Sequence, residues 1–132
     1  NLTTLNRPSV TSMEKFIRSI RFALAGWRVA FKEQRNFRIH LGAALVVVGA
    51  GLFFGINRTE WVMLVLTIAL VLVAELANTA IEYLVDLVSP AHDARAGAIK
   101  DVAAGFVLIA ALASIVVGMI IFGPRVLHYF RG

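Results

Sequence analysis

The sequence contains no cysteine, which excludes disulfide bonds and thiolate metal sites. Its three histidines, His40, His92 and His128, are too dispersed to suggest a metal site, and we assign His92 no role. Walker A, G-x-G-x-x-G and H-E-x-x-H patterns are also missing, so hydrolase triads, zinc chemistry and the common nucleotide-binding loops have no support. We expect no nucleic-acid partner.

Apolar residues dominate what is present. They make up 59% of the 132 residues, and the mean hydropathy of +0.80 is typical of an integral membrane protein. We expect one all-α membrane domain over residues 1–132. The hydrophobic runs predict membrane-spanning helices at 39–56, 61–88 and 102–122. A loop from Ala91 to about Ile99 should precede the third helix, and Gly123 with Pro124 should end it.

Residues 12–37 are predicted to form an amphipathic helix. Thr11 and Glu14 resemble a capping box, and apolar residues then recur at helical spacing as far as Phe31. Basic residues occupy much of the remaining surface, which favours a helix lying in the membrane interface against anionic headgroups. A soluble amphipathic helix packed on a partner is the alternative.

The basic residues also predict the orientation. Ten lie in the N-terminal segment or in the loop region up to and including Lys100, against three in the short turn after residue 56 and the C-terminal tail. The larger group should face the cytoplasm. We therefore expect a multi-pass protein of the bacterial inner membrane, with its N-terminus inside and its C-terminus outside.

The second hydrophobic run carries polar residues where lipid should exclude them. Glu75, Asn78, Glu82 and Asp86 follow one another at steps of three, four and four residues, which places them on one helix face. Ionisable residues at membrane depth cost several kcal/mol and mark functional sites. The run is longer than the hydrocarbon core, so its acidic end should emerge at headgroup level, where metal ions and nucleotides can reach it.

The residue types predict phosphoryl transfer. Carboxylates are the hard ligands that Mg²⁺ takes together with substrate phosphates, and a carboxylate in a low-dielectric setting can act as a general base. Lys100 can neutralise phosphate oxygens. Phosphoryl transfer needs these parts and little covalent chemistry from the protein.

Two signatures resemble the small bacterial diacylglycerol kinase and undecaprenol kinase family. The first is E-L-A-N-T-A-I-E-Y-L-V-D from Glu75 to Asp86, and the second is K-D-V-A-A-G from Lys100. The segment N-F-R-I-H-L from Asn36 is similar to the undecaprenol kinase branch. The resemblance covers about Phe16 to Phe122, nearly the whole chain.

The resemblance implies a homotrimer of subunits with one interfacial and three membrane-spanning helices, embedded in the lipid bilayer. It implies transfer of the ATP γ-phosphate to a membrane lipid alcohol, with Mg²⁺. Glu75 matches the general base, Asn78 a residue that positions the reacting groups, and Glu82 a metal and nucleotide ligand. Lys100 and Asp101 match the nucleotide-contacting pair. Arg18 is a further nucleotide-contact candidate, although headgroup attraction is the preferred interpretation.

One position departs from the family pattern. The family usually has a second metal-binding glutamate three residues before the aromatic of the N-F-R segment, and Gln34 stands there. Glu33 lies one residue earlier, turned by about 100° on a helix, so it could replace that ligand only if the helix rotates or frays.

Other functions stay open on spacing alone. The acidic stripe could serve a small oligomeric proton or cation carrier, or the polar residues could merely hold the helices of a scaffolding trimer together. The acceptor lipid is also open between diacylglycerol and undecaprenol, with the N-F-R-I-H-L segment favouring undecaprenol.

Overall fold

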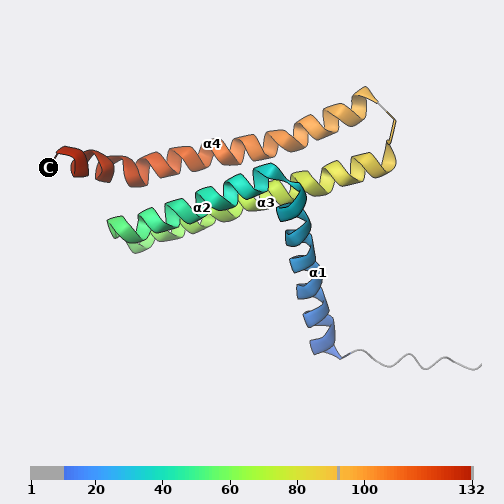
Figure 1. The fold of residues 1–132 in the computed structure, drawn as a ribbon, viewed down its shortest axis with the longest axis horizontal. Coiled ribbons are helices and arrows are strands. Elements are labelled where there is room, and N and C mark those ends of the chain that lie inside the picture. Colours follow the sequence, from blue (N-terminus) through green and yellow to red (C-terminus); the bar gives the residue numbers. More distant parts are fainter. Residues whose placement is uncertain (1–10, 92, 132) are drawn as a thin grey trace, which may run out of the picture.

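The computed structural model describes residues 11–91 and 93–131, which form four α-helices and no strand. α1 is Ser12–Glu33, α2 is Arg35–Phe54, α3 is Arg58–Val88 and α4 is Ala94–Arg131. The last three are long and apolar enough to cross a membrane. They run alongside one another, whereas α1 leaves them at a steep angle (Figure 1). The predicted all-helical fold with three apolar spanning helices is confirmed; His92 lies outside the described residues.

The helix expected over residues 12–37 is divided at Gln34. α1 starts at the predicted capping box, where Glu14 N donates to Thr11 Oγ1 at 3.3 Å and Thr11 N donates to Glu14 Oε2 at 2.8 Å. It ends at Glu33, because Gln34 has the extended backbone angles φ −97° and ψ 112°, and α2 begins at the next residue. The amphipathic helix and the first spanning helix therefore meet at one extended residue.

Two side chains from the first turn of α2 stabilise this break. Arg38 Nη1 donates to the carbonyl oxygens of Phe31 and Lys32, each at 3.0 Å, and so satisfies acceptors that the end of α1 leaves free. Phe37 is 1% exposed and packs edge-on against Trp27 of α1, with ring centroids 5.7 Å apart. The angle between α1 and α2 is thus held by tertiary contacts.

The connection between α2 and α3 is short and tightly fixed. Gly55 closes α2 with φ +60°, a conformation that favours glycine. A Cβ on Gly51 would lie only 3.0 Å from the Trp61 ring, so glycine lets the two helices approach. Asn57 then caps α3, with Glu60 N donating to its Oδ1 at 3.0 Å.

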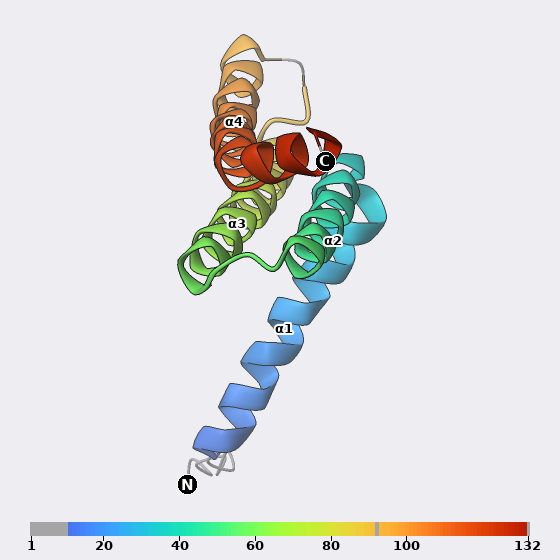
Figure 2. The ribbon, with the colours of Figure 1, turned by 90° about the vertical axis from the view of Figure 1, so that its left-hand side faces the viewer.

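α4 is longer at both ends than the sequence predicts. Asp93 accepts a hydrogen bond from Arg95 N at 2.7 Å, and α4 starts at Ala94, so the loop expected to reach about Ile99 is shorter. The prediction that the helix ends at Gly123 and Pro124 is wrong, because α4 continues to Arg131. Proline removes one backbone donor, and a helix can absorb that loss by bending. The final turns do change direction (Figure 2).

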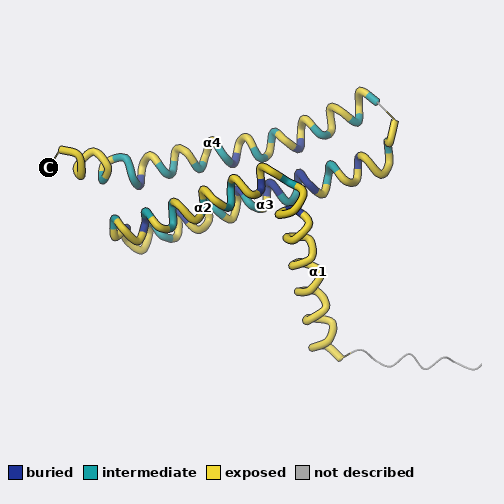
Figure 3. Tube along the Cα trace, viewed as in Figure 1, coloured by how far each residue is buried: buried dark blue, intermediate teal, exposed yellow. Residues whose placement is uncertain are grey.

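The core is a narrow seam along α3. One cluster comprises Ile56, Leu64 and Ile121, and a second comprises Val71, Ala74 and Ala110. Most other apolar side chains of the long helices are exposed, as the yellow outer faces show (Figure 3). In a single chain of this kind, lipid tails or further protein surfaces must cover those faces.

Candidate active site

One half of α3 carries the polar stripe, and the environment of its members changes along the helix. Glu75 is 2% exposed and Asn78 is 8% exposed, whereas Glu82 is half-buried and Asp86 is exposed. α2 and the end of α1 lie against this half of α3 through His40, Gln34 and other contacts. The stripe therefore runs from a buried acid to an exposed one.

Glu75 is the most enclosed acid of the stripe. Its Oε1 atom lies 3.2 Å from His40 Nε2 on α2, but that atom makes no hydrogen bond within the described residues. Thr79 does not relieve this, because its hydroxyl donates to the backbone oxygen of Glu75, at 2.9 Å. A buried carboxylate oxygen without a hydrogen-bond donor opposes folding, which makes Glu75 a candidate functional residue.

Glu82 is held by two amides. Asn78 Nδ2 donates to Glu82 Oε1 at 2.9 Å, and Gln34 Nε2 donates to Glu82 Oε2 at 3.2 Å. Asn78 Oδ1 remains buried without a hydrogen-bond partner among the described residues. A carboxylate and an unsatisfied amide oxygen thus lie together at the junction of α1, α2 and α3.

The break after α1 decides which of two neighbouring residues faces Glu82. Gln34 does so, as its hydrogen bond shows. Glu33, the candidate replacement for the missing metal ligand, instead accepts a hydrogen bond from the Tyr83 hydroxyl. The described structure therefore brings an amide to the position opposite Glu82 and turns the nearest carboxylate toward a phenol.

The start of α4 brings the second signature to the end of α3. Lys100 Nζ forms an ion pair with Asp86 Oδ1, so the two signatures meet across helices. Asp101 is exposed beside it. Arg18 is not brought to this cluster: it is exposed on α1, the helix that leaves the long helices at a steep angle (Figure 1).

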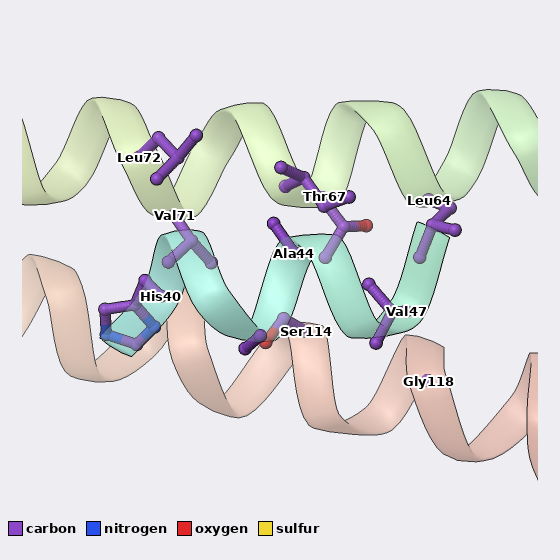
Figure 4. A pocket seen from close by; sticks show the side chains of 11 residues that line it. His40, Ala44, Val47, Leu64, Thr67, Val71, Leu72, Ser114 and Gly118 are labelled. Atoms are coloured by element: carbon purple, nitrogen blue, oxygen red, sulfur yellow. The ribbon is translucent and has the colours of Figure 1, made fainter. Parts of the chain in front are cut away.

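A small cavity of about 90 Å³ lies between α2, α3 and α4, with His40 among its lining residues. Figure 4 shows His40 at one end, Val47 and Leu64 toward the other, and Ser114 and Gly118 on α4. The lining is mainly apolar. His40 therefore separates an apolar interior from the polar contacts of Glu75.

Sequence reasoning did not find two of these contacts. The dispersed histidines give no reason to single out His40, and Tyr83 stands within the first signature without a predicted role of its own. Neither has a local signal: His40 meets Glu75 only because α2 packs on α3, and Tyr83 meets Glu33 only because α1 ends where it does. The one available hint was the position of His40 within the N-F-R-I-H-L segment.

Comparison with known proteins gives consistent matches. The family model for prokaryotic diacylglycerol kinase matches residues 21–122. An undecaprenol kinase of Bacillus subtilis is 38% identical over 114 residues, which cover 86% of this chain and 92% of that protein. A diacylglycerol kinase of Synechocystis is 42% identical over 110 residues, or 83% of this chain and 63% of that longer protein. A diacylglycerol kinase of Haemophilus influenzae is 30% identical over 113 residues, covering 85% and 96%.

Proposed function

The chain belongs to the prokaryotic diacylglycerol kinase family and is a lipid kinase, and we propose that it transfers the γ-phosphate of ATP to the primary hydroxyl of a membrane lipid alcohol. The observation that carries the mechanism is the burial of Glu75 at the inner end of a polar stripe whose outer end, Asp86, pairs with Lys100 of α4. This arrangement suits a hydrophobic alcohol that enters from the bilayer and a charged nucleotide that enters from water.

Glu75 is the general base in this proposal. Its carboxylate is 2% exposed, and Oε1 has no hydrogen-bond donor among the described residues. An oxygen in that state is available to accept the proton of an incoming hydroxyl. Asn78, one helical turn further along, is a positioning residue that holds Glu82 through its Nδ2 atom.

The donor atoms near Glu82 suit a magnesium ion. The Glu82 carboxylate and the unsatisfied Asn78 Oδ1 are hard oxygen ligands of the kind Mg²⁺ prefers. The described residues hold no cluster of three or more His, Cys, Asp or Glu able to bind a metal, which fits an ion held by one or two protein ligands together with phosphate oxygens. When bound, Mg²⁺ neutralises charge on the transferring phosphoryl group.

Lys100 and Asp101 are the proposed nucleotide contacts. Lys100 is a compact cation at the water-exposed end of the stripe, and Asp86 holds it there across the gap between α3 and α4. Asp101 is exposed and available beside it. Arg18 is a weaker candidate, because its exposed place on the amphipathic helix α1 fits attraction to lipid headgroups better.

The arrangement of acids disfavours an ion carrier. Glu75, Glu82 and Asp86 all occupy one half of α3, and the half before Glu75 is apolar as far back as Glu60 except for Thr67. Thr67 is satisfied by the backbone oxygen of Met63 at 2.7 Å. A relay along α3 would need ionisable groups in that apolar half as well.

Topology and assembly form part of the proposal. The excess of basic residues near the N-terminus and before α4 supports a cytoplasmic active site and a bacterial inner-membrane location. The exposed apolar faces of the long helices suit both lipid contact and packing against two further copies in a homotrimer.

A side-by-side assay tests the function and identifies the acceptor. Purified chain in vesicles receives MgATP with either undecaprenol or diacylglycerol, and ADP release and lipid phosphate are measured. We expect phosphorylation of at least one alcohol, with undecaprenol the first choice because of the N-F-R-I-H-L segment. Ion flux without nucleotide use, together with no lipid phosphate, would contradict the proposal and support the carrier.

A further inference from the structure

His40 of α2 lies next to Glu75, the proposed base on α3. Its Nε2 atom is 3.2 Å from Glu75 Oε1, and it is the basic side chain within ion-pair distance of Glu75 in the described part of the chain. The His40 side chain is 25% exposed, whereas that of Glu75 is 2% exposed. His40 is therefore the more accessible member of the pair.

Each turnover leaves a proton behind. The O–H bond of the lipid alcohol breaks, a bond forms between its oxygen and the γ-phosphorus, and the bond from that phosphorus to the leaving oxygen of ADP breaks. The proton passes to the Glu75 carboxylate. Glu75 cannot act as a base again until that proton leaves, and its burial keeps bulk water away from the carboxylate.

We propose that His40 accepts this proton from Glu75 and passes it to water. His40 would thus act on the reaction through Glu75, without touching the substrate itself. This inference rests on the proposed kinase function. A neutral imidazole with its hydrogen on Nδ1 has a lone pair at Nε2 that can take up a proton, and after protonation it can release the proton from its other nitrogen. His40 Nε2 and Glu75 Oε1 lie 3.2 Å apart without forming a hydrogen bond in the described residues, so a small rotation of the imidazole would bring them into line for the transfer.

The other groups near Glu75 are poorly suited to this task. Glu82, two helical turns further along α3, has both oxygens engaged by Asn78 and Gln34. Thr79 donates its hydroxyl to the α3 backbone. The α2, α3 and α4 residues that line the cavity beyond His40 are mainly apolar, so they offer no alternative exit in that direction.

Two variants of His40 test the inference, with His128 as the matched control. His40→Gln keeps a polar side chain that cannot take up a proton, and His40→Ala leaves space for added imidazole. His128 is exposed on the last turns of α4, so His128→Ala removes a histidine remote from Glu75. Oligomeric state in detergent and thermal unfolding show that each variant is folded.

We expect His40→Gln to lower kcat on the order of 100-fold while the KM values for MgATP and lipid stay unchanged. His40→Ala should show a similar loss that imidazole reverses saturably, whereas imidazole should not alter His128→Ala or the unsubstituted chain. A fully active His40→Gln, or a loss in His40→Ala that imidazole leaves in place, would overturn the inference. Failure of the unsubstituted chain to phosphorylate any lipid alcohol would instead refute the proposed function itself.

Discussion

The acidic residues in the two halves of α3 differ in how far their carboxylates are satisfied by hydrogen bonds. Near its start, Glu60 receives two hydrogen bonds from Arg125 of α4, at 2.9 and 2.7 Å, and one from the backbone of Asn57 at 2.8 Å. In the later half, Glu75 is more deeply buried and yet has an oxygen without a donor. The better satisfied acid is the one that ties two helices together.

This difference separates a structural acid from a reactive one. A bidentate arginine fixes a carboxylate in its charged form and in one position, which suits a helix–helix contact. Amide donors hold Glu82 in place without cancelling its charge, so it can still attract a cation. The number of acids in a membrane helix therefore says less about function than the partners of each one.

The comparison predicts its largest effect for Glu75→Gln. Removing the proposed base should reduce lipid phosphorylation by roughly 1,000-fold or more, with the oligomeric state unchanged, because the amide cannot accept the hydroxyl proton. Initial rates of ADP release with MgATP and lipid alcohol measure this. Full activity in this variant would remove the assignment of Glu75 as base.

Glu82→Gln should have the next largest effect. Even groups that only support a metal ligand change metal affinity by 10–100-fold, so losing a direct ligand should raise the Mg²⁺ concentration for half-maximal rate by roughly 100-fold. A magnesium titration at saturating ATP tests this. An unchanged titration curve would show that Glu82 does not bind the ion.

Gln34→Glu should have the reverse effect and strengthen magnesium binding. It places a second carboxylate opposite Glu82, where the amide now donates, and should lower the half-saturating Mg²⁺ concentration a few-fold. Glu33→Gln is the matched control, because Glu33 faces Tyr83. If the half-saturating Mg²⁺ concentration changed in Glu33→Gln but not in Gln34→Glu, Glu33 and not residue 34 would be the one that faces the ion beside Glu82.

Arg125→Gln should affect only the first half of α3, where Glu60 lies. Breaking the pair with Glu60 leaves a half-buried carboxylate without its cation, so thermal unfolding in detergent should occur at lower temperature. The kcat should stay unchanged below that temperature, because this end of the bundle holds no proposed reactive group. A large loss of kcat without loss of thermal stability would contradict the division between the two halves.

Much of the fold could be predicted because its signals are local. The acidic stripe follows from helical spacing, the Thr11 capping box from two residues, and the three long helices from runs of apolar side chains. The roles of Glu75, Glu82, Lys100 and Asp101 remain predictions that rest on motif resemblance and on their placement.

The remaining features depend on contacts between helices. The break at Gln34 is stabilised by Arg38 and by the packing of Phe37, which helical periodicity does not report. Proline normally ends a helix, but α4 continues past Pro124. Arg125, the next residue, donates hydrogen bonds to Glu60 and to the backbone oxygen of Ile121. The pairing of His40 with Glu75 likewise exists only in three dimensions.

The tight connection from Gly55 to Asn57 has a consequence for how such a chain can evolve. Because it anchors the start of α3, one codon inserted between Trp61 and Glu75 would rotate everything downstream by about 100° and advance it by about 1.5 Å. Glu75 would then leave His40, and Glu82 would leave Gln34, in a single event. Changes in length across this interval should therefore be eliminated by selection, whereas many changes of apolar side chain there should survive.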